Sequence, residues 1–236
     1  MKFLIFLLTF AVLALMIPAE SSAAVQATPP VPMGAMSDGG AAPGADDYQV
    51  LAQKLIAGQD WTGAVLVTRE AITRYPDDGE FYCLDGYALR KLGLYNDAVS
   101  EITQAIALDP RPIRYDNRGY AYLALRDYPA ALADAGAGIA GNPANPVGYI
   151  VGALALGGEG RTGEALEEID KAIALDQGNA HAWHVKGSLL AARGNCTGAR
   201  EALAHAFSIN PDYDLPWPGF PGIREDRDAL NVICAR

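Results

Sequence analysis

Three patterns of hydrophobic and polar residues follow one another along this chain of 236 residues. Residues 3–17 are apolar and carry no charge, and residues 25–45 have neither a helical nor a strand period. From residue 45 onward, helix-like segments recur about every 34 residues. The patterns predict an export segment, a linker and an α-helical repeat region, in that order.

The first segment has the charged start and apolar middle of a secretory signal peptide. Small residues such as Ser21, Ala23 and Ala24 follow the run and offer cleavage sites. The apolar run is also shorter than the roughly 20 residues that span a bilayer. We therefore expect residues 1–24 to be a signal peptide, or a short N-terminal anchor if they are retained. Either outcome makes the protein secreted or associated with the cell envelope.

The second segment, residues 25–45, is a mixture of Ala, Pro, Gly and Met that includes Pro29, Pro30, Gly39 and Gly40. This composition is typical of a flexible linker, because it buries too little apolar surface to fold by itself. We expect it to hold the folded region away from a membrane or from the export machinery.

The repeat is clearest where each helical segment ends. A short motif closes each segment, and its copies are 34, 33, 34 and 34 residues apart. The copies are Tyr75-Pro76, Asp109-Pro110, Asn142-Pro143, Asp176-Gln177 and Asn210-Pro211. Proline at this place stops one helix and begins the next.

The residues before each end also recur in register: a bulky residue, Gly or Ala, a large apolar residue, a turn that usually contains Gly, and two further small residues. The second copy has Tyr82, Gly86, Leu89, Gly93, Ala98 and Ala105 in these places. This skeleton resembles the tetratricopeptide repeat, and five copies cover about 45–78, 79–111, 112–145, 146–179 and 180–211. The resemblance implies an all-α fold: a right-handed superhelical solenoid of antiparallel helix pairs.

Residues 212–236 have the composition of a C-terminal cap. Trp217 and Phe220 lie among prolines, and residues 223–235 can form one more helix with Leu230 on its apolar face. A solenoid must cover its last apolar face, so we expect Trp217 and Phe220 to plug the open end rather than to bind a ligand.

Glycines accumulate where the third and fourth copies meet, among them Gly136, Gly138, Gly148 and Gly152. Each glycine inside a helix costs about 1 kcal/mol. This accumulation favours a flexible joint between residues 130 and 165.

Charge and motifs exclude several classes of function. The formal net charge is −10, with 18 Lys and Arg against 28 Asp and Glu, so a nucleic-acid partner is not expected. No phosphate-binding loop, nucleophile elbow or HExxH motif is present. His181 and His184 lie one helical turn apart but lack a further ligand on their helix. We expect no enzymatic activity, no cofactor and no metal.

Three cysteines, Cys83, Cys196 and Cys234, leave an odd count for a chain that enters an oxidising compartment. Cys196 begins the second helix of the fifth copy and Cys234 ends the expected capping helix beside it. A disulfide between them would pin the cap, but two buried thiols fit the sequence equally well.

The family resemblance also implies a binding surface. In tetratricopeptide proteins the first helices of successive repeats line a concave groove that binds peptides. Carried over by position, the groove residues are Cys83, Tyr87, Arg90, Lys91, Asp116, Asn117, Tyr120 and His184. Packing between first helices explains Tyr87 and Tyr120 as well as ligand contact does.

Together these features predict a non-enzymatic, exported scaffold or adaptor that binds a protein or peptide in its groove. The alternative is a structural module of the cell envelope that associates with itself to form homo-oligomers. Direct contact with a membrane is expected only through a retained N-terminal anchor.

Overall fold

The computed structural model describes residues 43–211 and, beyond them, Asp226, Asp228 and Leu230. The predicted signal peptide, most of the linker and most of the cap, with Trp217, Phe220 and Cys234, lie outside the described residues. Within the described residues, no helix is both long and apolar enough to cross a membrane.

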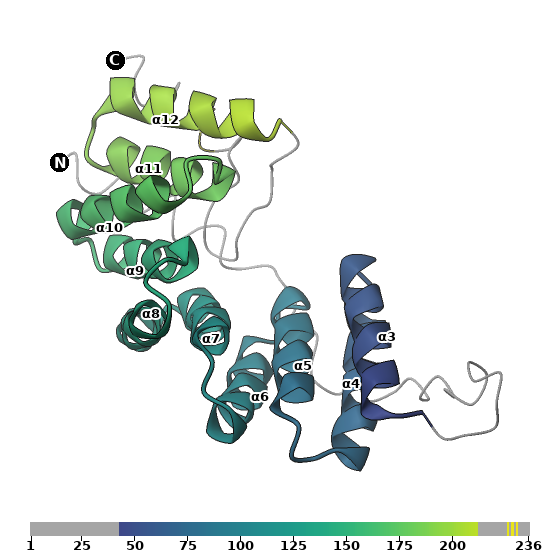
Figure 1. Ribbon diagram of the computed structural model, residues 1–236. Helices are drawn as coiled ribbons and strands as arrows, with labels where there is room; N and C mark the ends of the chain where they lie inside the picture. The colour runs from purple at the N-terminus through teal and green to yellow at the C-terminus, as the bar shows by residue number, and fades with distance from the viewer. Residues whose placement is uncertain (1–42, 212–225, 227, 229, 231–236) are drawn as a thin grey trace.

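Ten α-helices in residues 43–211 form five consecutive antiparallel pairs that stack into an arc (Figure 1). The first helices are α3 (Ala45–Ala57), α5 (Gly79–Lys91), α7 (Pro112–Ala124), α9 (Pro146–Gly158) and α11 (Ala180–Ala192). The second helices are α4 (Trp61–Arg74), α6 (Tyr95–Leu108), α8 (Tyr128–Gly141), α10 (Thr162–Leu175) and α12 (Cys196–Ile209). No strand occurs in this part of the chain.

Side-chain caps fix where many of these helices begin. Asp60, Asp127 and Asn195 precede α4, α8 and α12, and each accepts a hydrogen bond from the backbone N–H three residues further on. Similar Asp or Asn caps start α5, α9 and α11. Because these side chains satisfy donors that the helix leaves unpaired, the capping residues set the phase of the repeat.

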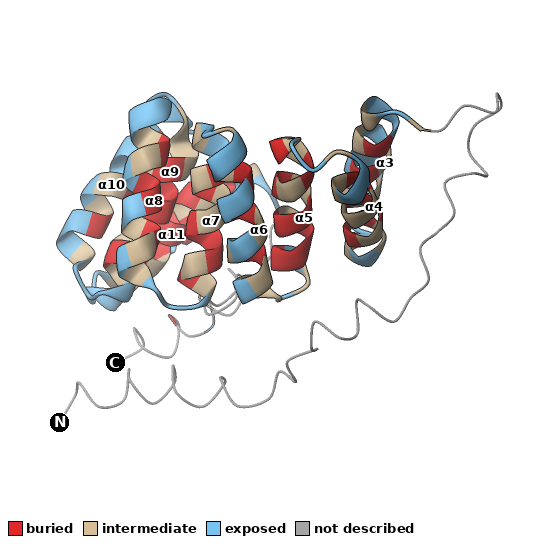
Figure 2. Ribbon diagram, turned by 90° about the horizontal axis from the view of Figure 1, so that it is seen from below, coloured by how far each residue is buried: buried red, intermediate tan, exposed pale blue. Residues whose placement is uncertain are grey.

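Small residues form the contact surface of the second helix in each pair. Pairs of small residues seven positions apart lie buried, and the alanines among them have no exposed surface. These pairs are Ala64 and Ala71, Ala98 and Ala105, Ala131 and Gly138, Ala165 and Ala172, and Ala199 and Ala206. Short side chains at these positions let the helix backbones approach closely. Buried residues lie where the helices face one another along the stack (Figure 2).

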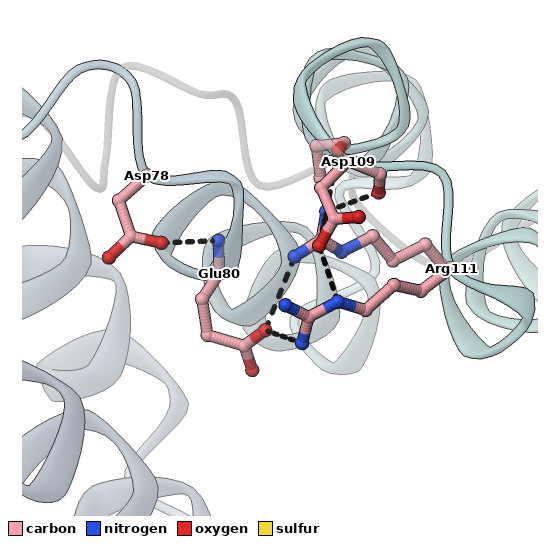
Figure 3. Close-up of polar contacts among 6 residues, drawn as sticks. Asp78, Glu80, Asp109 and Arg111 are labelled. Atoms are coloured by element: carbon pink, nitrogen blue, oxygen red, sulfur yellow. Dashed lines mark hydrogen bonds and ion pairs between the residues drawn. The ribbon is translucent and has the colours of Figure 1, made fainter.

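A group of charged side chains closes the contact between α5, α6 and α7, and we call Glu80, Asp109, Arg111 and Arg114 the charged junction (Figure 3). Arg114 is only 1 % exposed, and its Nη1 donates to the carbonyl oxygens of Asp109 and, at 2.8 Å, of Ala105. Its Nη2 lies 3.3 Å from Glu80 Oε2, while Arg111 pairs with Asp109 and lies 3.8 Å from Glu80. Charged groups therefore hold these three helices together.

The contact between α7, α8 and α9 is built differently, and we call Gly119, Gly136, Gly138, Gly148 and Gly152 the glycine junction. A Cβ atom added at Gly119 would lie 2.8 Å from Val151 Cγ1, and one added at Gly148 would lie 2.9 Å from Ile139 Cγ1. Both α8 and α9 run through their glycines without a break. Gly119 and Gly148 therefore permit close packing; the flexible joint stays a prediction.

The described residues beyond position 211 touch the last helix pair. Asp226, Asp228 and Leu230 are helical, and Leu230 is 1 % exposed against Ala199, Leu203 and Ala206 of α12. This contact covers part of the apolar face at the end of the stack.

Candidate functional site

Inner-helix residues from two adjacent repeats meet at one cationic side chain. The first helices α5, α7, α9 and α11 lie along the inner side of the arc, with α6, α8 and α10 outside them (Figure 1). Arg90, on α5, is 6 % exposed, and its guanidinium carbon lies 5.0 Å from the Tyr87 ring centroid and 5.4 Å from that of Tyr120 on α7. The cation is thus held between two aromatic faces.

The same arrangement extends to both sides of Arg90. Lys91 Nζ lies 5.6 Å from the Tyr87 ring and 5.8 Å from the Trp61 ring on α4. On the other side, the Tyr120 ring stacks on His181 of α11 with centroids 6.3 Å apart. We call Trp61, Tyr87, Arg90, Lys91, Tyr120 and His181 the cation–aromatic cluster.

Desolvation shapes the charge of this cluster. It lowers the pKa of Arg90, and desolvation followed by repulsion from Arg90 lowers the pKa of Lys91. The pKa of His181 falls to about 3, first because of desolvation and then because of His184 and Lys91. His181 is therefore neutral at physiological pH, and Arg90 and Lys91 carry the positive charge. Lys91 is exposed and Trp61, Tyr87 and His181 are half-buried, so this edge of the cluster is the part that a partner could contact.

The other predicted groove residues have different positions. Asp116 is 1 % exposed beneath the surface, where its Oδ2 accepts a hydrogen bond of 3.0 Å from Asn145 Nδ2. Cys83 is 7 % exposed and free, and burial, followed by Glu80, raises the pKa of its thiol. Asn117 is half-buried on α7. Asp116 and Cys83 therefore lie beneath the surface, and Asn117 stays a predicted groove residue.

His184 belongs to the contact with the C-terminal residues. It is 5 % exposed, and its Nε2 lies 3.0 Å from Asp226 Oδ2, which also accepts a hydrogen bond from Ser188. Cys196 is disulfide-bonded, but its predicted partner, Cys234, lies outside the described residues. That pairing stays a prediction.

Two members of the cluster were not chosen as binding residues from the sequence alone. Trp61 was not among the predicted groove residues, and His181 was considered with His184 as an incomplete metal pair. Trp61 directly follows the capping Asp60, which is the signal that could have placed it at the start of α4, beside the end of α5. Among the described residues, no three His, Cys, Asp or Glu side chains form a metal-binding group.

Comparisons with known proteins agree with this architecture. A tetratricopeptide repeat model matches residues 79–112. Tetratricopeptide repeat protein 13 of Homo sapiens is 30 % identical over 110 residues, which cover 47 % of this chain but only 13 % of the human protein. The matched part is thus a small fraction of that relative.

Solved structures extend the similarity over most of the helices. A thermophilic TPR protein of Thermus thermophilus is 19 % identical, with a TM-score of 0.68 over 82 % of this chain and 100 % of its own. YrrB, described as a TPR protein with an unusual peptide-binding site, is 21 % identical, with a TM-score of 0.54 over 72 % of this chain and 88 % of its own. The fold is an all-α tetratricopeptide-repeat solenoid.

Proposed function

We propose that this protein is a non-enzymatic scaffold that binds a peptide or protein partner on its inner helices, at the cation–aromatic cluster. The observation that carries the proposal is the position of Arg90 between Tyr87 and Tyr120. Rings and a cation from separate repeats meet there, and aromatic and Arg side chains are the residue types that dominate binding energy at protein interfaces.

The fold supports the same function. In a solenoid, each repeat presents its first helix to one continuous surface, so a long partner can contact several repeats at once. YrrB, a protein of this fold, is described as having a peptide-binding site, which makes a peptide a reasonable occupant here.

The site of action that we propose is outside the cytoplasm. The support comes from residues 1–24, which combine a charged start, an apolar run and small residues in the order of a signal peptide. The protein would then be secreted or held at the cell envelope. Fractionation of the producing cells tests this: recovery of the full chain in the cytoplasm would contradict it.

The partner-binding proposal is tested by affinity capture from envelope and medium fractions with the parent chain and a Tyr87→Ala, Tyr120→Ala double variant. A matched control is Tyr115→Ala with Tyr122→Ala, since these rings flank Arg118 at 5.8 and 5.7 Å on another face of α7. A partner bound by the parent and the control, but lost by the cluster variant, supports the proposal.

Two outcomes would count against it. If the cluster variant stays folded and captures the same partner, the cluster is not the binding site. If the parent captures only further copies of itself, with a mass that rises with concentration, the self-associating structural module becomes the better explanation.

A further inference from the structure

A hollow of about 320 Å³ lies away from the cation–aromatic cluster, between the outer helices α8 and α10, with α9 at its floor. Its walls and floor are apolar or small, and its rim is charged. The apolar or small lining residues are Leu132, Ala135, Gly136, Ile139, Gly152 and Leu156. The charged rim comprises Arg161, Glu164, Glu167 and Glu168. We call this hollow the outer groove.

The outer groove exists because two side chains are missing at one contact between repeats. At the other contacts, the ninth residue of a second helix bonds the seventh residue of the following first helix. These pairs are Arg69 with Asp85 at 3.8 Å, Thr103 with Arg118 at 3.0 Å, and Asp170 with Lys186 at 2.7 Å. At the contact of α8 with α9, the same two positions are Gly136 and Gly152.

These two glycines are not required by close packing. A Cβ atom added at Gly136 would meet nothing within 4 Å, and one added at Gly152 would lie at an ordinary 3.7 Å from the Ala135 Cβ. Gly119 and Gly148 of the same junction, by contrast, face atoms at 2.8 and 2.9 Å. Glycine inside a helix costs about 1 kcal/mol, so Gly136 and Gly152 keep space open at the expense of stability.

The rim sets the charge of a suitable occupant. Arg161 is already paired with Glu159 and Glu164, and Lys171 is paired with Glu168. Glu167 is exposed, and no ion pair to it occurs within the described residues. With Glu159 and Lys171 included, four acids stand against two bases along this edge. The edge is therefore negative, which complements Lys or Arg on a partner.

We propose that the outer groove binds a peptide segment of a partner protein in which a large apolar side chain is flanked by Lys or Arg. The apolar side chain fills the space left at Gly136 and Gly152, and the flanking cations face the α10 rim. Burying an aliphatic side chain in such a hollow is the kind of contact that anchors a peptide, while the charges favour encounter and register. This site is separate from the cation–aromatic cluster and does not rest on its function.

The test uses the full chain and a fluorescent helical peptide of about twelve residues, with Leu on one face and Lys on the other, followed by fluorescence anisotropy. Two matched peptides replace every Lys by Glu or every Leu by Ala. We expect saturable binding of the Leu–Lys peptide that weakens with salt, and at least about tenfold weaker binding of either matched peptide.

Variants then locate the site. Gly136→Leu places a side chain in the outer groove and should weaken binding at least about tenfold, whereas Gly163→Leu, at an exposed glycine of α10 with equal free space, should not. The double change Gly136→Asp with Gly152→Lys rebuilds the pair seen between Asp170 and Lys186, and it should close the groove equally well.

Several results would overturn the proposal. One is equal binding of the Leu–Lys peptide to the parent and to both folded groove variants. Another is binding of the Glu peptide that equals binding of the Leu–Lys peptide. A third is no saturable binding of the Leu–Lys peptide up to about 1 mM, which is the weak end of specific recognition. Self-association of the parent that Gly136→Leu abolishes would instead assign the groove to a second copy of the chain. Binding unchanged by the Tyr87→Ala, Tyr120→Ala variant supports the separation of the two sites.

Discussion

The charged junction and the glycine junction hold adjacent repeats in different ways. In the first, the buried guanidinium of Arg114 ties backbone carbonyls and Glu80 together across α5, α6 and α7. In the second, glycines bring α7, α8 and α9 close together, and the polar bonds are an ion pair of Arg118 with Asp134 and a hydrogen bond from Asn145 to Asp116. The repeat geometry is the same in both.

This difference teaches that a solenoid repeat fixes where helices lie but not what fills the space between them. A junction closed by long charged side chains leaves no room for a further molecule. A junction lined by glycines can leave a hollow wherever a glycine is not needed for packing, as at Gly136 and Gly152. Functional variation between repeats can therefore reside in the junctions.

The largest effect is expected from removing the centre of the charged junction. Arg114→Ala would leave the Ala105 and Asp109 carbonyls and Glu80 without their buried cation, at a cost of about 3 to 5 kcal/mol. Urea unfolding measures this loss. Arg111→Ala is the matched control, because the side chain of Arg111 is 59 % exposed and such pairs contribute about 0 to 1 kcal/mol. Similar losses in both variants would contradict the assignment of the junction to Arg114.

Two buried carboxyl groups, Asp116 beside the glycine junction and Asp85 between α4 and α5, should make the stability of the protein depend on pH. Burial, followed by the nearby Asp134, raises the pKa of Asp116 to about 6, and burial raises the pKa of Asp85, at the contact of α4 with α5, to about 7. A carboxyl group with a raised pKa stays protonated in the folded protein at a pH where the unfolded chain has lost that proton. These two groups therefore make the protein less stable as pH rises from about 4 to about 7.

The expected slope is roughly 1 kcal/mol per pH unit for one such group within its window. Urea unfolding at several pH values measures it. Asp116→Asn and Asp85→Asn should each flatten the curve and stabilise the protein above pH 7 relative to the parent. A parent curve that is already flat between about pH 5 and 7 would show that neither carboxyl group stays protonated in the folded protein.

The smallest changes in stability are expected from substitutions within the glycine junction, at one glycine that is tightly packed and at one that faces free space. Gly119→Ala places a Cβ atom 2.8 Å from Val151 Cγ1 and should cost about 1 to 3 kcal/mol, because Val151 is stiff and tightly packed. Gly136→Ala meets free space and should instead stabilise the helix by about 1 kcal/mol. Thermal unfolding compares the two variants. Changes of the same sign would mean that the packing distinction is wrong.

The fold followed from the sequence because its signals are local and repeated. The helix-ending motif at intervals of about 34 residues and the recurring skeleton of bulky and small residues predicted an all-α solenoid of helix pairs. Tyr87, Arg90, Lys91 and Tyr120 were also placed on the inner helices, because position within a repeat determines which way a residue faces.

The candidate site could be predicted only in part. Asp116 was expected on the groove surface but is buried. Gly138 of α8 makes room for it, because a Cβ atom at position 138 would collide with Asp116 Oδ1. Trp61 and His181 join the cation–aromatic cluster from α4 and α11, and their meeting with α5 and α7 depends on how tightly the stack curves. Periodicity does not report that curvature.

The sequence by itself determined the element type, the phase of the repeat and the helix faces, because hydrophobic period, caps and prolines act within a few residues of chain. Only the tertiary structure decided which side chains meet across repeats: the rings around Arg90, the buried position of Asp116 and the outer groove between α8 and α10. Those contacts depend on the distance between helix backbones, and that distance is set by the sizes of side chains that are far apart in the sequence.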